Sequence, residues 1–278
     1  MRRSRVFRHL SPSWNLMPTI HPTAIVDSAA ILAEDVQIGP YCVIGPQVEI
    51  GKGSRLLSHV SIAGRTRVGE DCSLHPFVAL GEPPQDFKYK GGEVSLEIGD
   101  RNTLREHVTM HMGTETGRGV TRVGTGGYFM VASHVAHDCI VGDNVVFANS
   151  ASVGGESTVG DYVIMGGLSA LHQKCRIGKY AFIGGGAAVT GDVIPYGMAD
   201  NHGWLAGLNL VGLKRRGFSR EVIHDLRTAY RLLFAEEGAF TERVEDTARL
   251  FAPRQEVQDV IAFIRASGSR PLCFPEPR

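Results

Sequence analysis

The stretch from residue 20 to residue 62 reads IHPTAIVDSAAILAEDVQIGPYCVIGPQVEIGKGSRLLSHVSI, and its period decides the fold. An aliphatic residue stands at every sixth position from Ile20 to Leu80. These positions are Ile20, Val26, Leu32, Ile38, Ile44, Ile50, Leu56, Ile62, Val68, Leu74 and Leu80. Because large apolar residues make up roughly a third of an ordinary chain, such a run by chance has odds on the order of 1 in 100,000. The period resumes at Ile98 and, after a shift of one residue, continues from Val123 to Val189.

A second column of small residues or valine lies four positions after most of the aliphatic residues, as at Ala24 and Val36. Glycine often follows the aliphatic residue directly, as at Gly51 and Gly142, and it suits a corner with unusual backbone angles. Neither helical spacing nor plain strand alternation produces a period of six over this length. The repeat therefore predicts a β-solenoid of short strands, with about 18 residues per triangular turn and a rise of about 4.8 Å per turn.

Two polar, glycine-rich segments at about residues 82–97 and 113–122 break the register, and we expect them to be loops that leave the solenoid at corners. The solenoid is assigned to residues 18–196 and a small helical domain to residues 197–278. Ser219 is the expected N-cap of a helix, with two more helices near 241–251 and 256–266. Residues 1–17 share no pattern with the repeat, so we expect a disordered extension with Met17 as the natural start.

Composition excludes several classes of protein. Among the 278 residues Lys+Arg and Asp+Glu both number 29, so the formal net charge is zero, which argues against a nucleic-acid binder or attraction to an anionic membrane. No apolar run approaches the ~18 residues of a membrane span, and no apolar stretch follows the N-terminal arginines as in a secretory signal. Five widely spaced cysteines fit a reducing compartment, so a cytoplasmic protein is expected. Four of them fall in the small inward column and are interpreted as core residues.

Two histidines, His134 and His137, stand beside an inward aliphatic residue and must point outward. An outward histidine is the ordinary choice for a base at neutral pH, and a solvated surface histidine is the plain alternative. The 18-residue turn stacks His137, Gly155 and Gln173 above one another on successive turns. Gly155 has no side chain to obstruct its backbone N–H, which suits stabilisation of an oxyanion.

A zinc site is the other reading of the histidines, since some hexapeptide-repeat proteins hold zinc with three of them. His111, His134, His137 and His172 are the available set. No spacing among them demands zinc, and their polar neighbours fit acyl transfer without a metal. The sequence therefore predicts no metal site.

The chain resembles the hexapeptide-repeat acyltransferases and, within them, the family of UDP-N-acetylglucosamine O-acyltransferases that open lipid A biosynthesis. The resemblance covers about residues 18–265. The segments that support it are IHPTA at 20–24, QDFKY at 85–89, IGDRN at 98–102, HVAHDC at 134–139, HQ at 172–173 and GLKRRGFSR at 212–220. It implies an all-β left-handed parallel β-helix with a helical C-terminal domain, and a homotrimer with active sites in clefts between subunits.

The same resemblance implies roles for individual residues. His137 matches the general base and Gly155 the oxyanion donor, while Gly185 matches a residue that sets the length of the acyl chain and here implies a long chain. The positions that match the substrate-binding cleft are Asp86, Lys88, His111, His134, His172, Gln173, Asn209, Arg215 and Arg216. Glu156 stands where the family commonly has histidine, and Val211 where an acidic residue is common.

The implied reaction transfers a (R)-3-hydroxyacyl group from acyl carrier protein to the 3-hydroxyl of UDP-N-acetylglucosamine. No cofactor is expected, because the carrier brings its own phosphopantetheine. Three alternatives stay open at this point. One is the later N-acyltransferase of the same pathway, although the start of the repeat at Ile20 leaves no room for its extra N-terminal domain. The others are an acetyl-CoA-dependent sugar acetyltransferase and a structural or binding solenoid, which would have flat, repetitive outer faces.

Overall fold

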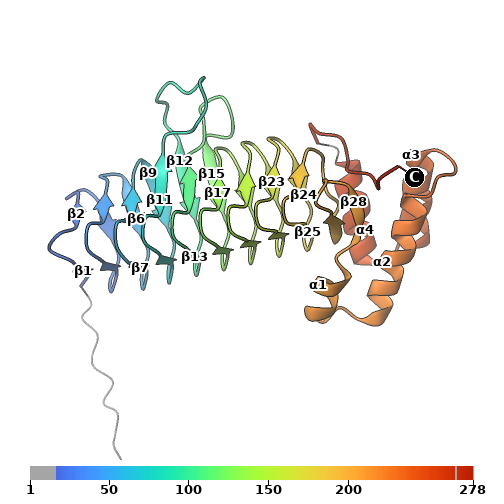
Figure 1. The fold of residues 1–278 in the computed structure, drawn as a ribbon, viewed down its shortest axis with the longest axis horizontal. Coiled ribbons are helices and arrows are strands. Elements are labelled where there is room, and N and C mark those ends of the chain that lie inside the picture. The colour runs from blue at the N-terminus through green and yellow to red at the C-terminus, as the bar shows by residue number, and fades with distance from the viewer. Residues whose placement is uncertain (1–16, 267, 278) are drawn as a thin grey trace, which may run out of the picture.

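The computed structural model describes residues 17–266 and 268–277, so the expectation for the first 16 residues lies outside the described part. Three sheets wrap around one core and form a long triangular coil, which leads into a cluster of helices (Figure 1). Sheet A contains, in spatial order, β1 (Thr19–Ile20), β4 (Gln37–Ile38), β7 (Arg55–Leu56), β10 (Ser73–Leu74), β13 (Thr103–Leu104), β16 (Tyr128–Phe129), β19 (Val146–Phe147), β22 (Ile164–Met165), β25 (Phe182–Ile183), β27 (Gly197–Ala199) and β28 (Leu205–Leu208).

The other two sheets alternate with sheet A along the chain. Sheet B contains β2 (Ile25–Val26), β5 (Val43–Ile44), β8 (Ser61–Ile62), β11 (Ala79–Glu82), β14 (Thr109–His111), β17 (His134–Val135), β20 (Ser152–Val153), β23 (Ala170–Leu171) and β26 (Ala188–Val189). Sheet C contains β3 (Ile31–Leu32), β6 (Val48–Ile50), β9 (Arg65–Val68), β12 (Ser95–Ile98), β15 (Val120–Val123), β18 (Ile140–Val141), β21 (Thr158–Val159) and β24 (Arg176–Ile177). We name the edges of the prism after the sheets that meet there: the A–B, B–C and C–A corners.

Parallel pairing confirms the 18-residue turn. His134 pairs with Ser152 and Ser152 with Ala170, and most of the coil follows this register. The aliphatic residue of each hexad points into the core, and from Ile38 onward these residues are almost completely buried. One turn cannot bury its own core, so the stacking of turns stabilises the prism.

The expected reason for the glycines that follow the aliphatic residues is wrong. Residues in the left-handed region at the corners are mostly not glycine, as at Asp138, where φ is 60°. A Cβ on Gly51 would instead lie 2.6 Å from the backbone carbon of Gly69 in the next turn. Close approach between successive turns, rather than an unusual backbone angle, is why these positions need glycine.

Both loops leave the coil at the B–C corner and project from the same side (Figure 1). They are shorter than expected, because β12 begins at Ser95 and β15 at Val120, which leaves residues 83–94 and 112–119 between strands. The backbone N–H of Lys90 in the first loop donates to Glu115 Oε1 in the second at 2.7 Å. The two loops are therefore tied together beside the coil.

The coil runs past residue 196, where we expected it to end. β27 continues sheet A in parallel with β25, and β28 then pairs with β27 in the antiparallel direction. The helices are α1 (Leu210–Arg215), α2 (Arg220–Leu233), α3 (Phe240–Leu250) and α4 (Gln255–Arg265), of which α1 was not expected. Ser219 caps α2 as expected, with Oγ accepting from the N–H of Val222 at 3.2 Å. None of the described helices is both long and apolar enough to cross a membrane.

Candidate active site

Three histidines gather at the B–C corner. The rings of His111 and His134 meet edge to face, with centroids 4.9 Å apart. Burial, together with the neighbouring His111, lowers the pKa of His134 to about 4, and burial also lowers the pKa of His111. Both rings are therefore neutral at pH 7 and serve as hydrogen-bonding groups. His134 Nδ1 already bonds Thr109 Oγ1 at 2.8 Å, whereas His111 Nδ1 is buried without a hydrogen-bond partner.

His137 has a partner that the sequence analysis did not identify. Its Nδ1 lies 2.9 Å from Oδ2 of Asp138, and the Asp138 side chain is fully buried. Burial by itself would raise the pKa of this carboxyl, but hydrogen bonds from Thr114, His137 and Arg118 outweigh burial and hold the pKa below its ordinary value. Asp138 is thus a carboxylate that accepts a hydrogen bond from Nδ1–H of His137. In the sequence, the only sign of this partnership is that Asp138 directly follows His137 and precedes the inward Cys139.

The second loop is what buries Asp138. The N–H and Oγ1 of Thr114 donate to its carboxylate at 3.0 and 2.7 Å, and the N–H of Arg118 donates at 2.7 Å. A carboxylate held by several donors keeps its charge even in a buried place. The loop at residues 112–119 therefore builds the support for His137.

Gly155 lies directly under the His137 ring. A Cβ at residue 155 would fall 2.5 Å from His137 Nε2, so no larger residue fits there without moving the ring. The column predicted from the 18-residue turn is confirmed by backbone bonds: the N–H of Glu156 donates to the His137 carbonyl, and the N–H of Lys174 to the Gly155 carbonyl, both at 2.9 Å. Gln173 stands one turn further on, next to His172, and both side chains are exposed.

The loop residues Asp86 and Lys88 lie at this same corner, in the segment that joins β11 to β12. Asp86 Oδ1 accepts the N–H of Lys88 at 2.9 Å, and the Lys88 side chain is exposed. The B–C corner thus assembles most of the predicted site. The predicted residues at this corner or on the adjoining strands are Asp86, Lys88, His111, His134, His137, Gly155, His172 and Gln173.

The predicted basic residues lie at a different corner. Arg216 stacks over Tyr162 at the C–A corner, 4.4 Å from the ring centroid. Asn209 is the N-cap of α1, where Oδ1 accepts from Gly212, and its Nδ2 donates to the Tyr180 carbonyl at 2.9 Å. Arg215, in the last turn of α1, is exposed. Within one chain these residues belong to a separate surface from His137.

Gly185 belongs to the third corner, A–B, between β25 and β26. A Cβ at Gly185 would meet only the Gly167 backbone, with the carbonyl oxygen at 3.4 Å and the nitrogen at 4.0 Å, so a side chain there would extend outward. The predicted site is therefore divided among three corners of the prism. Within one chain these three corners do not meet.

The two departures from the family pattern have different surroundings. Glu156 forms an ion pair with Lys174, with Oε1 and Nζ 3.4 Å apart, right beside Gly155. Val211 is an exposed residue of α1. Glu156 therefore places a balanced charge pair at the edge of the site.

The cysteines and the possible metal ligands are also candidates for functional groups. Burial raises the pKa of the Cys139 and Cys175 thiols to about 12, which agrees with their interpretation as core residues. All five cysteines are free. Within residues 17–266 and 268–277, no three His, Cys, Asp or Glu side chains are arranged to hold a metal ion.

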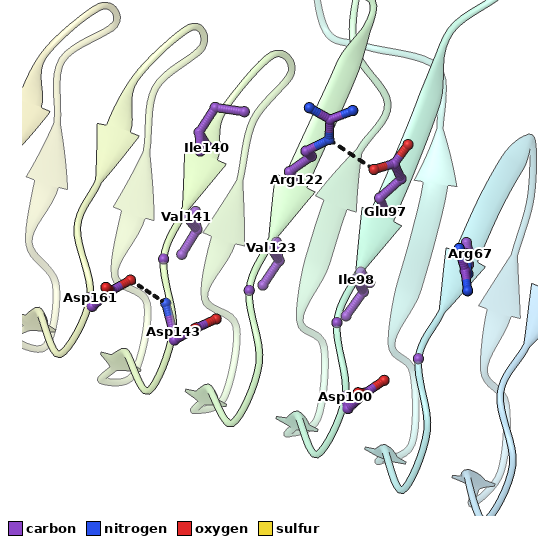
Figure 2. Close-up of a pocket in the computed structure, with 14 residues that line it drawn as sticks. Arg67, Glu97, Ile98, Asp100, Arg122, Val123, Ile140, Val141, Asp143 and Asp161 are labelled. Atoms are coloured by element: carbon purple, nitrogen blue, oxygen red, sulfur yellow. Dashed lines mark hydrogen bonds and ion pairs between the residues drawn. The ribbon is translucent and has the colours of Figure 1, made fainter.

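A groove on sheet C is a separate feature (Figure 2). Its outward side chains form a ladder of alternating charge that includes Arg67, Glu97 and Arg122, and the last two form an ion pair at 2.8 Å. Asp161 Oδ1 in this groove accepts the backbone N–H of Asp143 at 2.8 Å. None of the predicted site residues lines the groove, and its carboxylates accept from Arg122 or from backbone N–H groups.

Comparison with known proteins agrees with this geometry. A family model described as UDP N-acetylglucosamine O-acyltransferase, domain 2, matches residues 192–273. The acyl-(acyl-carrier-protein)–UDP-N-acetylglucosamine O-acyltransferase of Caulobacter vibrioides is 58% identical over 259 residues, which cover 93% of this chain and 98% of that protein.

Solved structures are similar over more than nine-tenths of this chain. The UDP-N-acetylglucosamine O-acyltransferase of Moraxella catarrhalis is 41% identical with a TM-score of 0.85, over 91% of this chain and 98% of that one. The UDP-N-acetylglucosamine acyltransferase of Francisella novicida is 33% identical with a TM-score of 0.90, over 94% and 95%. The expected fold class, a left-handed parallel β-helix with a small helical C-terminal domain, is confirmed. By its identity to these relatives over more than nine-tenths of its length, the chain belongs to the family of acyl-(acyl-carrier-protein)–UDP-N-acetylglucosamine O-acyltransferases.

Proposed function

We propose that the chain transfers a (R)-3-hydroxyacyl group from acyl carrier protein to the 3-hydroxyl of UDP-N-acetylglucosamine, with His137 as the general base. The family supplies the reaction class, the first step of lipid A biosynthesis. The observation that supports the residue assignment is the pair of His137 and the buried carboxylate of Asp138, 2.9 Å apart, directly above Gly155.

The base works through the tautomer that Asp138 selects. A carboxylate can only accept, so the ring proton of neutral His137 sits on Nδ1 and the lone pair on Nε2 faces outward. Nε2 takes the proton from the 3-hydroxyl of the sugar as the hydroxyl oxygen attacks the thioester carbonyl. The resulting imidazolium is stabilised by the charge of Asp138 and returns the proton to the leaving thiol of the carrier.

Gly155 supplies the second part of the mechanism. The absence of a side chain lets the Gly155 backbone lie close against the His137 ring, so that the Gly155 N–H and His137 Nε2 can act on the same substrate group. The Gly155 N–H donates to the oxyanion of the tetrahedral intermediate, and the ester then forms as the carbon–sulfur bond breaks. His111 and His134 are neutral at pH 7, so their rings orient the substrate as hydrogen-bonding groups rather than as charges.

The outer faces of the prism support a homotrimer. From β10 onward the outward residues of sheet A carry no charge, and the same holds for sheet B from β8 onward apart from Glu82 at the end of β11, whereas sheet C carries the charged ladder. The outward residues on sheet A are Ser73, Thr103, Tyr128, Val146, Ile164, Phe182 and Met198; those on sheet B are Ser61, Ala79, Thr109, His134, Ser152, Ala170 and Ala188. Uncharged faces of this extent are typical of surfaces that pack against a partner.

Three copies around an axis beside the A–B corner would place sheet A of one copy against sheet B of the next. The C–A corner of one subunit then meets the B–C corner of its neighbour, which unites Asn209, Arg215 and Arg216 with His137. Gly185 lies at the inner end of the same interface. The acyl chain would run inward from the base toward Gly185, and the basic residues would bind the diphosphate or the acidic carrier.

The chain needs no cofactor in this mechanism, because the carrier brings its own phosphopantetheine, and we place the enzyme in the cytoplasm with that carrier. The test is mass spectrometry of products formed from a pool of 3-hydroxyacyl carriers, with UDP-N-acetylglucosamine and its 3-amino analogue offered together. The expected product is an O-linked 3-hydroxyacyl sugar nucleotide, and light scattering should give three times the mass of one chain. Transfer from acetyl-CoA alone, or no transfer from any carrier, would refute the proposal.

A further inference from the structure

We propose that Arg270 is a positioning residue of the active site, which locks His172 in the tautomer that donates a hydrogen bond to substrate. Arg270 lies in the segment after α4, far along the chain from the site. The inference rests on the proposed function, since that function places His172 and Gln173 in the substrate cleft.

Two nitrogen atoms of Arg270 form hydrogen bonds to the turn that contains His172 and Gln173. Its Nε donates to the carbonyl oxygen of Gln173 at 3.0 Å, and its Nη2 lies 2.7 Å from Nδ1 of His172. A guanidinium presents its donors in a rigid fork, so two such contacts fix both the ring and the peptide. The guanidinium therefore holds two neighbouring residues of the site at once.

The chemistry of the fork decides where the His172 proton sits. An arginine side chain has five N–H donors and no acceptor, so His172 Nδ1 must accept. His172 Nδ1 also lies 3.2 Å from the carbonyl oxygen of Gln173. Because Nδ1 accepts a hydrogen bond, it carries no proton to donate to that oxygen. Both atoms accept from the guanidinium of Arg270 instead. The ring proton of His172 is consequently on Nε2, which is left as a free donor.

The segment that holds Arg270 is itself anchored to the last turns of the coil. Leu272 pairs with Asp192 in a parallel bridge, in which the Asp192 N–H donates to the Pro271 carbonyl and the Cys273 N–H to the Asp192 carbonyl, both at 2.8 Å. The buried carboxylate of Asp192 is in turn held by Arg176 at 2.7 Å. Arg270 therefore extends from a fixed strand of backbone, and its position is set by the fold.

His137 and His172 are thus held in opposite tautomers, one by a hydrogen-bond acceptor and the other by a donor. Asp138 is an acceptor and leaves a lone pair on Nε2 of His137, which suits a base. Arg270 is a donor and leaves a proton on Nε2 of His172, which suits binding of an acceptor oxygen. The ligand group for His172 is thus a carbonyl or phosphate oxygen of the bound substrate.

The direct test is nitrogen-15 NMR of the histidine rings in the full-length protein, with His172→Asn to assign the signal. We expect the Nε2–H tautomer at His172 in the wild type and a mixture of tautomers in Arg270→Ala. A predominantly Nδ1–H ring in the wild type would overturn the proposal. This measurement needs no catalysis, so it stands apart from failure of the proposed function, which would appear as absent acyl transfer by the wild type.

Kinetics provide the second readout. In Arg270→Ala and Arg270→Lys we expect KM to rise about 2–10-fold, the range of one neutral hydrogen bond, while kcat changes less because His137 is untouched. Added guanidinium should partly rescue Arg270→Ala. The control is Arg265→Ala, which removes only the exposed ion pair with Glu245. If Arg270→Ala does not fold, Arg270→Lys decides, and unchanged KM together with an unchanged tautomer in that variant would refute the assignment.

Discussion

Two corners of one coil use the same backbone repeat for different tasks. At the B–C corner the residue in the left-handed region is polar, and the loop at 112–119 folds over Asp138 and shields it from water. At the C–A corner the equivalent positions near the helical domain are tyrosines, whose rings stack with centroids 4.8 and 5.6 Å apart. They are Tyr162, Tyr180 and Tyr196.

The comparison separates reaction from recognition. A buried carboxylate beside an outward histidine can move a proton, because its charge is held by donors and unscreened by water. A stack of rings with Arg216 above it offers a flat, positively charged surface, which suits a diphosphate or an acidic protein. One backbone geometry thus supports either task, and the side chains added at the corner decide which.

Removal of the base should cause the largest loss of activity, and it should affect only the function of the B–C corner. His137→Ala should lower kcat by about 10²–10⁴-fold, the usual contribution of a positioned general base. Turnover by a stopped assay and mass by light scattering measure the result. Near-normal turnover with an intact oligomer would contradict the assignment.

The A–B corner should respond in chain-length preference rather than in rate. Gly185→Met should move the preference toward shorter acyl donors, because a side chain there extends outward and fills the end of the groove. Each buried methylene contributes ~0.8 kcal/mol, so four carbons change the preference by up to ~3 kcal/mol. Competition between donors of different length measures it, and an unchanged ranking in an active variant would remove Gly185 from this role.

Loss of the Asp138 charge should weaken the base without removing it. Asp138→Asn keeps the shape but no longer selects the Nδ1–H tautomer, so kcat should fall about 10–100-fold, the equivalent of one hydrogen bond to a charged group. Thr121→Val, which removes a hydroxyl bonded only to the Asp138 N–H, is the matched control. Equal losses in the two variants would show that packing, not charge, is what matters.

The C–A corner should respond in affinity and in salt dependence. Arg215→Ala and Arg216→Ala should raise KM by about tenfold with little change in kcat, and the carrier should bind more weakly at high ionic strength because exposed charges are screened. Arg249→Ala, at an exposed ion pair on α3, is the control. Salt-independent binding by the wild type and both variants would argue against a charged contact here.

The smallest effect concerns pH and stability. His134 has a folded-state pKa of about 4, below its ordinary value of 6.5. Its contribution to stability is therefore complete above pH 6.5 and is lost as the pH falls toward 4, since protonation then favours the unfolded chain. Urea unfolding between pH 7 and 4 should show a shallower decline for His134→Gln than for the wild type. His202→Gln, at an exposed position, should follow the wild-type curve.

Much of the candidate site followed from local spacing. The 18-residue turn predicts that Gly155 lies one turn along the coil from His137, because parallel pairing repeats one step along the axis for each turn of chain. The helix that begins after Ser219 followed from its N-cap. By contrast, the helix α1 was not predicted because it has only six residues, too few for an apolar repeat, and its cap Asn209 is also held by the Tyr180 carbonyl of the coil.

The sequence by itself determined the coil, its register, its two loops and the outward position of the base, because each depends on residues a fixed number of positions apart. Only the tertiary structure decided which partners those residues meet. Asp138 became a buried carboxylate when a loop closed over it, and Arg270 reached His172 across 98 residues when the chain returned to the coil. Contacts between segments distant in sequence depend on how the folded chain closes in space, and no period or cap encodes that closure.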